Sequence, residues 1–154
     1  MSGCYECLER AGRASGALQL RGQLGAEHRV IEGAVNAAYE AVVPIAVSGP
    51  AGRVRDVEAV IDTGYNGFLT LPPVLVAELG LPFVSNGQAI LADGGEATFD
   101  IHSVTVLLDG QPRDVDVYVS DTAPLVGMRL LDGHGVCIEV ESGGRVVIER
   151  GTTG

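Results

Sequence analysis

The chain has 154 residues, enough for one domain with its own core, and 46% of them are hydrophobic against 19% charged. This composition excludes a disordered chain and a coiled coil, and 22 Gly with 7 Pro favour short strands joined by turns over long helices. The formal net charge of −10, from 10 Arg against 20 acidic residues, argues against nucleic acid as a partner, because phosphate contacts need a basic face.

The first thirty residues differ from the rest of the chain and are expected to form a leader or flexible extension. Residues 1–30 hold four Arg and three Glu, a net charge of +1, whereas residues 31–154 carry −11. A sharper hypothesis is that the translation start is assigned too early and that Val30 occupies the initiator position. Mass spectrometry of the native N-terminus separates the two, because a peptide from residues 5–20 would exclude the later start.

The cysteines and the hydropathy indicate a cytoplasmic protein. Three Cys, an odd number, do not form a disulfide framework. Cys4 and Cys7 have a spacing known from zinc and redox sites, but no second Cys pair or paired His supplies the other ligands, so we expect no metal. The Gly-rich turns at 49–52, 94–95 and 143–144 lack the G-x-G-x-x-G and Gly-Lys-Ser/Thr patterns of phosphate binding, and we expect no organic cofactor. Cys137 lies in an apolar strand and is expected to be a small core residue. No run of 18 apolar residues and no secretory signal is present, so no membrane partner is expected.

From residue 31 onward, short apolar runs alternate with turn residues, which predicts an all-β sandwich or barrel. Pro44 cannot donate to a ladder, so it predicts an edge or bulge position. Pro72 and Pro73 are expected to open a short helix that ends at Gly80. We expect a domain over residues 31–150, a tail at 151–154, and strands at 40–47, 54–61, 68–71, 89–91, 97–108, 115–119, 136–140 and 146–148, with turns at 49–52, 92–95, 109–112 and 142–144.

The most informative stretch is Ala-Val-Ile-Asp-Thr-Gly at residues 59–64. Asp62 follows an apolar strand directly, and Gly64 permits close approach of another backbone. On its own the triplet is also ordinary turn chemistry, in which the Asp carboxylate accepts hydrogen bonds from nearby backbone N–H groups. A second element, the apolar pair Leu125 and Val126 followed by Gly127, lies far downstream and is expected to lead into a short helix.

These two elements and the Gly-rich hairpin between them resemble, in their order, the retropepsin-like, or retroviral-type, aspartic peptidases over residues 31–150. The resemblance implies a closed acid-protease β-barrel with one or two short helices, functional as a two-fold homodimer. It further implies that Asp62 is the catalytic carboxylate, that the Thr63 hydroxyl locks two active-site loops together, that Gly64 is the close-approach position, that Asp93, Gly94 and Gly95 form a flap tip over the substrate, and that Leu125, Val126 and Gly127 pack beneath the active-site loop.

Two positions depart from the family pattern. The family usually has a small residue, most often Ala, after the triplet, whereas Tyr65 and Asn66 follow here and are expected to border the nearest substrate subsite. Met128 occupies a position after Gly127 where a polar residue is common. The three His residues, His28, His102 and His134, are scattered along the chain and are assigned no role.

One Asp-Thr-Gly triplet per chain points to a dimer. Peptide hydrolysis of this kind needs one carboxylate as a base toward water and another as an acid toward the carbonyl. The only other Asp-Thr pair, Asp121-Thr122, lacks the Gly. A two-fold axis would bring Asp62 and its mate together, where like charge makes simultaneous ionisation costly.

Three functions follow as hypotheses. The first is an intracellular homodimeric aspartic endopeptidase acting on a peptide or protein substrate. The second is a non-catalytic dimeric β-domain that binds peptides or partner proteins by strand addition in the same cleft. The third is a self-processing enzyme that removes its own first thirty residues, which would appear as loss of the leader from the wild-type protein only.

Overall fold

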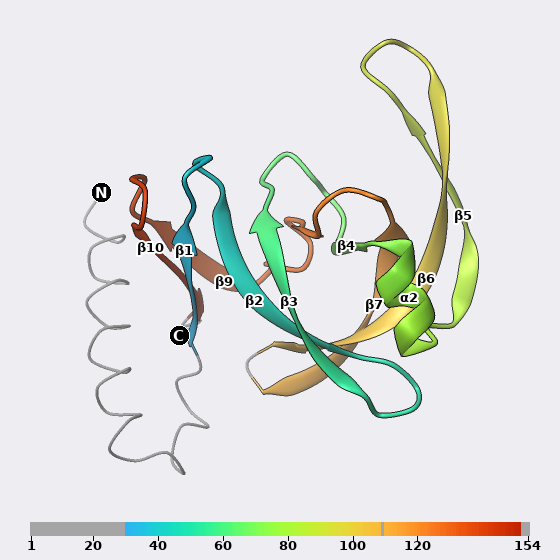
Figure 1. The fold of residues 1–154 in the computed structure, drawn as a ribbon, viewed down its shortest axis with the longest axis horizontal. Helices are drawn as coiled ribbons and strands as arrows, with labels where there is room; N and C mark the ends of the chain where they lie inside the picture. The colour runs from blue at the N-terminus through green and yellow to red at the C-terminus, as the bar shows by residue number, and fades with distance from the viewer. Residues whose placement is uncertain (1–29, 109, 152–154) are drawn as a thin grey trace.

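The computed structural model describes residues 30–108 and 110–151, so Cys4, Cys7, the rest of residues 1–29 and residues 152–154 lie outside the described residues. Within this part of the chain there are ten strands and one short helix (Figure 1), which confirms the expected all-β class. The elements are β1 (Val30–Val35), β2 (Ala41–Ser48), β3 (Val54–Ile61), β4 (Leu69–Leu71), α2 (Pro73–Leu79), β5 (Phe83–Ile90), β6 (Glu96–Leu108), β7 (Gln111–Val119), β8 (Leu125–Val126), β9 (His134–Ile138) and β10 (Arg145–Arg150).

Six of the strands close into a barrel. The order around it is β2, β3, β8, β4, β7 and β6, and the ring closes because β6 pairs back onto β2 through residues 105–107. Closure leaves these strands without free edges except where a strand runs beyond its partner. The expectation of a closed β-barrel is therefore confirmed.

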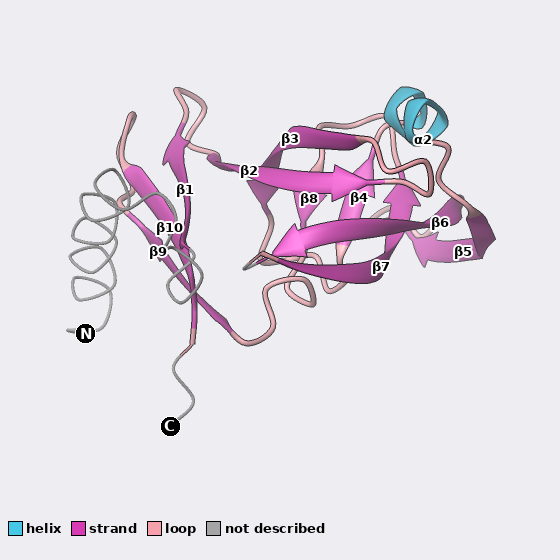
Figure 2. Ribbon diagram, turned by 90° about the horizontal axis from the view of Figure 1, so that it is seen from below, coloured by secondary structure: helices cyan, strands magenta, loops and turns pink. Residues whose placement is uncertain are grey.

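The remaining strands extend the barrel on two sides. On one side β1 continues from β2 and carries β10 and β9 in antiparallel order, forming a separate leaf beside the barrel (Figure 2). On the other side β5 pairs only with β6, and this hairpin projects well beyond the barrel (Figure 1). The helix α2 lies against the outside of the barrel near the base of the hairpin.

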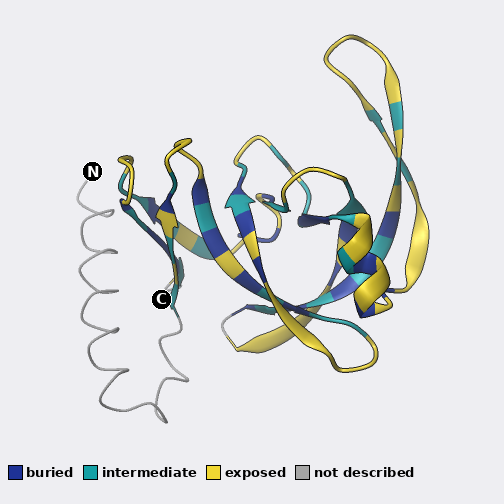
Figure 3. Cartoon of the chain, viewed as in Figure 1, coloured by how far each residue is buried: buried dark blue, intermediate teal, exposed yellow. Residues whose placement is uncertain are grey.

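The barrel interior is filled by alternate β-branched and Leu side chains. Val43, Ile45 and Val47 of β2 are at most 1% exposed, and the residues between them are half-buried or exposed (Figure 3). This period of two places every second side chain on the core face, as expected for a barrel wall. The same core contains Leu69, Leu71, Val104, Val106, Leu108, Val117, Val126 and Leu130, and it extends to Val146 and Ile148 of β10 in the neighbouring leaf.

The strand β6 serves both the barrel and the projecting hairpin. Val104, Val106 and Leu108 are buried in the barrel core. Ile101 and Phe99 lie an odd number of residues away, and so on the opposite face of the same strand. The two parts of β6 therefore bury opposite faces.

Pro44 does not lie in an edge strand, because β2 has β3 on one side along its whole length. On its other side, however, β2 pairs with β1 at Ala41 and Val42 and with β6 from Ala46 to Ser48. Pro44 falls in the gap between these two pairings. The missing N–H donor is therefore tolerated within a central strand because no partner strand is present at that point.

Several strands differ from the sequence predictions. The strand expected at 115–119 is β7, which already begins at Gln111, within the turn expected at 109–112. The strand expected at 89–91 is only the end of β5, which begins at Phe83. The strand expected at 136–140 is β9, which begins at His134 and ends at Ile138, and Val140 is 74% exposed. The strand β1 was not predicted, because Glu32 and Gly33 interrupt its apolar pattern. In contrast, the helix α2 begins at Pro73 and ends before Gly80, as expected.

Candidate active site

Asp62 lies at the end of β3, in a loop held by backbone hydrogen bonds. Its carboxylate Oδ1 accepts a hydrogen bond of 2.9 Å from the Gly64 N–H, and its own N–H donates to the Val126 carbonyl at 2.9 Å. The Tyr65 N–H donates to the Asp62 carbonyl at 3.2 Å. Asp62 is half-buried, whereas Thr63 and Gly64 are exposed. The loop thus presents a carboxylate of fixed orientation at the surface of the barrel.

The short strand β8 holds this loop from below. It lies between β3, to which it is parallel, and β4, to which it is antiparallel. Val126 is fully buried and pairs with both Ile61 and Leu69, so the strand that ends at Asp62 cannot move independently of residues 125 and 126. The structure therefore brings Leu125, Val126 and Gly127 together with the Asp62 loop.

Gly127 contacts the loop too closely for any side chain. A Cβ on Gly127 would lie 2.1 Å from the Gly67 carbonyl oxygen and 2.7 Å from Tyr65 Cδ2. Its N–H donates to the Phe68 carbonyl at 2.9 Å, and the Met128 N–H donates to the Tyr65 carbonyl at 2.8 Å. The close packing of the two segments requires a glycine here.

The short helix expected after Gly127 is a wrong prediction. Residues 128–133 form consecutive turns with i→i+3 hydrogen bonds, such as Leu130 N–H to the Gly127 carbonyl at 3.2 Å. The bonds of Leu131 to Met128 and of His134 to Leu131 have the same i→i+3 spacing, and Gly133, with a φ of 84°, ends the run of turns. The N–H groups of Met128 and Arg129 donate to the carbonyls of Tyr65 and Gly67, which ties this segment to the Asp62 loop. The Arg129 guanidinium lies 5.9 Å from the Phe68 ring centroid, which adds a cation–π contact between the same two segments.

Thr70 is a supporting residue that the sequence did not reveal. It lies between two fully buried leucines in β4, is 7% exposed, and its Oγ1 accepts a hydrogen bond of 2.9 Å from the Leu125 N–H. A hydroxyl in a buried Leu-Thr-Leu strand is the only signal the sequence offers, since buried hydroxyls require a partner. Thr70 therefore ties β8 to β4 through a side chain.

We expect Thr70→Val to lower the free energy of unfolding by about 1–3 kcal/mol, because the Leu125 N–H loses its acceptor while the shape is kept. Thr70→Ser is the matched control, since it retains the oxygen and removes only a methyl group. Denaturant titration of the three proteins gives the comparison. Equal stability of Thr70→Val and the wild type would show that the hydrogen bond contributes nothing.

Tyr65 points into the structure and not away from the loop. Its ring makes an edge contact with Tyr118, with centroids 6.1 Å apart. Its hydroxyl is buried and has no hydrogen-bond partner among the described residues. Burial, together with the neighbouring Tyr118 and Asp116, raises the pKa of Tyr65 to about 12. Asn66, in contrast, is exposed.

This raised pKa predicts a loss of stability at alkaline pH. The Tyr65 phenol has a higher pKa in the folded chain than in the unfolded one, so its contribution is complete below pH about 10 and is lost as the pH rises toward 12. We expect the wild type to lose stability relative to Tyr65→Phe over this range. Chemical denaturation of both proteins at a series of pH values up to 11 tests this, and parallel pH dependences would contradict it.

The hairpin tip is built as the Gly-rich pattern predicts but lies apart from the Asp62 loop. The Asp93 Oδ1 accepts a hydrogen bond of 2.8 Å from the Gly95 N–H, and Gly94 has a φ of 84°. Figure 1 shows the tip standing away from the loop between β3 and β4. The structure thus brings residues 62–67 and 125–127 together and leaves residues 93–95 at the end of a projecting arm.

A hollow of about 420 Å³ opens beside the exposed side of the Asp62 loop. It is lined by Thr63, Met128 and His134, with Ile61, Leu131 and Val136 as further apolar walls. Met128 is 47% exposed, so this side of the site presents apolar surface to the solvent.

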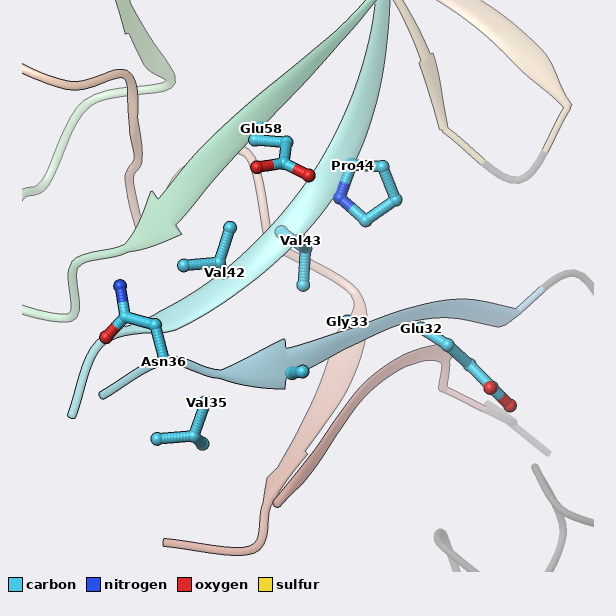
Figure 4. Close-up of a pocket in the computed structure, with 9 residues that line it drawn as sticks. Glu32, Gly33, Val35, Asn36, Val42, Val43, Pro44 and Glu58 are labelled. Atoms are coloured by element: carbon cyan, nitrogen blue, oxygen red, sulfur yellow. The ribbon is translucent and has the colours of Figure 1, made fainter. Parts of the chain in front are cut away.

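A second hollow, of about 480 Å³, lies elsewhere on the molecule (Figure 4). It occupies the gap beside Pro44, between β1 and the middle of β2, and is bordered by Glu32, Asn36 and Glu58. Glu32 is paired with Arg145 at 3.3 Å. The hollow contains none of the residues that the sequence singled out for the site.

Cys137 and His102 both contact other parts of the fold, away from the Asp62 loop. Cys137 is buried against Val147 in a small cluster, in agreement with a core position. The His102 Nδ1 lies 2.9 Å from the Leu81 carbonyl oxygen.

Among residues 30–108 and 110–151 no three His, Cys, Asp or Glu side chains are grouped so that they could hold a metal ion. No helix in the described part of the chain is long and apolar enough to span a membrane.

Comparison with known proteins gives similarity in structure alone. No protein-family model matches the chain, and no curated protein sequence matches it. Solved structures similar to it include a retropepsin-like aspartic protease from Rickettsia conorii, with 17% identity, 80% of this chain and 92% of that chain covered, and a TM-score of 0.49. EIAV protease in complex with the inhibitor HBY-793 has 17% identity, covers 63% and 89% of the two chains, and gives a TM-score of 0.47. Simian Foamy Virus (mac) protease has 16% identity, with 58% of this chain and 91% of that chain covered, and gives a TM-score of 0.42.

Proposed function

We propose that the chain is an aspartic endopeptidase that acts as a homodimer, with a water activated between the Asp62 carboxylates of two copies. The observation that carries the proposal is the placement of Asp62. One carboxylate oxygen is oriented by the Gly64 N–H, the loop is tied to β8 through Val126, and the neighbouring Thr63 is exposed beside an open hollow. A preorganised carboxylate at the surface is suited to acid–base chemistry.

The reaction uses one ionised and one protonated Asp62. The ionised carboxylate takes a proton from water as the water oxygen attacks the carbonyl carbon, and the protonated one gives its proton to the carbonyl oxygen. When the resulting diol collapses, the C–N bond breaks and the carboxyl group that took the water proton gives it to the leaving nitrogen. The other carboxylate takes a proton from a hydroxyl of the diol. The products are a carboxylic acid and an amine, and the two carboxyl groups return to their starting states.

The second carboxylate has to come from another copy of the chain. Asp121 is the only other Asp followed by Thr, and it lies in an exposed bend without the Gly64 equivalent. A partner placed against Thr63 and Met128 would cover the hollow beside the loop. The site is therefore incomplete in one copy, and activity is expected to fall as the protein is diluted below the concentration at which it dimerises.

The proposed substrate is an extended peptide bound between the barrel and the projecting hairpin. Asp93, Gly94 and Gly95 would close over it, and Tyr65 and Asn66 would border it. The net charge of −10 favours peptides that are basic or neutral.

One observation favours a second candidate function, the binding of peptides without cleavage. The edge strand β5 is eight residues long, largely exposed, and contains no charged residue. Such an edge can accept an added strand through its main-chain groups. In this function Asp62 has no chemical role, so binding would survive its replacement.

The test is cleavage of a mixed peptide library by the 154-residue chain over acidic to neutral pH, with Asp62→Asn in parallel. Cleavage by the wild type alone supports the peptidase. A folded, dimeric wild type that binds peptides and cleaves none at any pH would support the binding function. Sedimentation analysis of both proteins establishes that they are dimers under the assay conditions.

A further inference from the structure

The side chain of Tyr65 occupies space beside the catalytic loop that the two neighbouring glycines leave free. A Cβ on Gly67 would lie 2.4 Å from the Tyr65 hydroxyl, and one on Gly127 would lie 2.7 Å from Tyr65 Cδ2. The ring therefore lies directly over both glycines. The Tyr65 ring can occupy this position because Gly67 and Gly127 have no side chains there.

Aromatic contacts fix the ring from its far side. Tyr118 of β7 meets Tyr65 at an interplanar angle of 65°, and Phe99 of β6 stacks on Tyr118 with centroids 6.3 Å apart. Phe99 belongs to the strand that continues into the projecting hairpin. The three rings thus form a continuous aromatic row from the Asp62 loop to Phe99, which pairs with Gly87 of β5 within the projecting hairpin.

The hydroxyl of Tyr65 does not face the proposed substrate. It is buried and finds no hydrogen-bond partner among the described residues, whereas the residue as a whole is only half-buried. The part of Tyr65 that reaches the solvent is therefore not its hydroxyl. An unpaired buried hydroxyl costs free energy, so the structure tolerates it only because the ring fills the space.

We propose that Tyr65 determines specificity by filling a subsite between the Asp62 loop and the projecting hairpin, so that the enzyme selects small side chains at that position of the peptide. The proposal rests on the proposed peptidase function and adds its substrate class. Replacing the ring by a methyl group would leave a pocket bounded by Gly67, Gly127 and Tyr118, able to take a bulky apolar side chain. Because a two-fold dimer has two Tyr65 residues, the preference applies to one position on each side of the scissile bond.

The test is kcat/KM for a peptide library in which each position carries Gly, Ala, Leu or Phe. The proteins compared are the 154-residue wild type and its variants Tyr65→Ala, Tyr65→Leu and Tyr65→Phe. We expect Tyr65→Ala to raise the ratio of bulky to small residues by about tenfold or more at one position on each side. Tyr65→Leu should raise the same ratio by a smaller factor. This variant provides the measurement if Tyr65→Ala does not fold. Tyr65→Phe keeps the ring, so it should keep the wild-type preference and be at least as stable.

The outcomes separate the two proposals. A wild type that cleaves peptides, with the same preference in the Ala and Leu variants, overturns the role of Tyr65 and leaves the peptidase function standing. An equal loss of kcat/KM for all peptides also overturns it, because a merely structural role would lower every substrate alike. A wild type that cleaves nothing overturns the peptidase function, and the specificity proposal with it.

Discussion

Asp62→Asn is expected to lower the rate of peptide cleavage by about 10³-fold or more, because acid–base catalysis by the carboxyl pair is removed in both copies at once. The loop itself should persist. An Asn side-chain oxygen can still accept the hydrogen bond from the Gly64 N–H, and the backbone bond from the residue 62 N–H to Val126 is unaffected. The fall is measured by single-substrate kinetics at the pH of highest wild-type activity.

The matched control is Asp121→Asn, which makes the same chemical change in the other Asp-Thr pair of the chain. Asp121 is exposed, so its substitution should leave both cleavage and stability unchanged. Equal activity of Asp62→Asn and the wild type would contradict the mechanism. Mixing experiments add a second check, since a dimer of one wild-type and one Asp62→Asn chain should also be inactive.

Gly127→Ala is expected to lower the free energy of unfolding by about 3 kcal/mol or more, a large part of the stability of a small domain. The added Cβ would lie 2.1 Å from the Gly67 carbonyl oxygen and 2.7 Å from the Gly67 carbonyl carbon. These are backbone atoms of a loop tied down by three hydrogen bonds from residues 127–129, so no side chain can simply rotate away. Thermal and denaturant unfolding give the difference.

Gly135→Ala is the control for this substitution. A Cβ on Gly135 of β9 would have its nearest neighbour, the Glu149 carbonyl oxygen, at 3.9 Å, which is an ordinary contact. The stability should therefore change by no more than about 0.5 kcal/mol. If Gly127→Ala is as mild as Gly135→Ala, the close packing of residues 65–67 on residue 127 does not limit the stability of the fold.

The position of Asp62 at a strand end could be predicted from the sequence because it depends on local chemistry, an apolar strand that ends in Asp-Thr-Gly. The packing of residues 125–127 against this loop joins distant parts of the chain, and it was implied only by the resemblance to the retropepsin-like order of elements. The hairpin tip at Asp93 was predictable from local chemistry, since an Asp two residues before a Gly forms a local turn.

Features that depend on distant partners could not be predicted in the same way. Residues 85–88, Ser-Asn-Gly-Gln, are typical of a loop, yet they form the middle of β5 because β6 supplies the hydrogen-bond partners. After Gly127 the chain forms consecutive i→i+3 turns that stop at Gly133, and the Met128 and Arg129 N–H groups bind carbonyls of the distant Asp62 loop. The inward direction of Tyr65 depends on Tyr118, more than fifty residues away in the chain.

Because β6 buries opposite faces in its two parts, residues cannot be inserted into or deleted from this strand without disturbing the packing of one part. Val104, Val106 and Leu108 enter the barrel core, whereas Phe99 and Ile101 occupy the opposite face of the same strand. Inserting or deleting one residue within this strand would turn one of these sets to the wrong side, because side chains alternate with a period of two. Length changes in the hairpin are therefore confined to its tip at residues 91–95, where an added or lost residue leaves the barrel wall as it is.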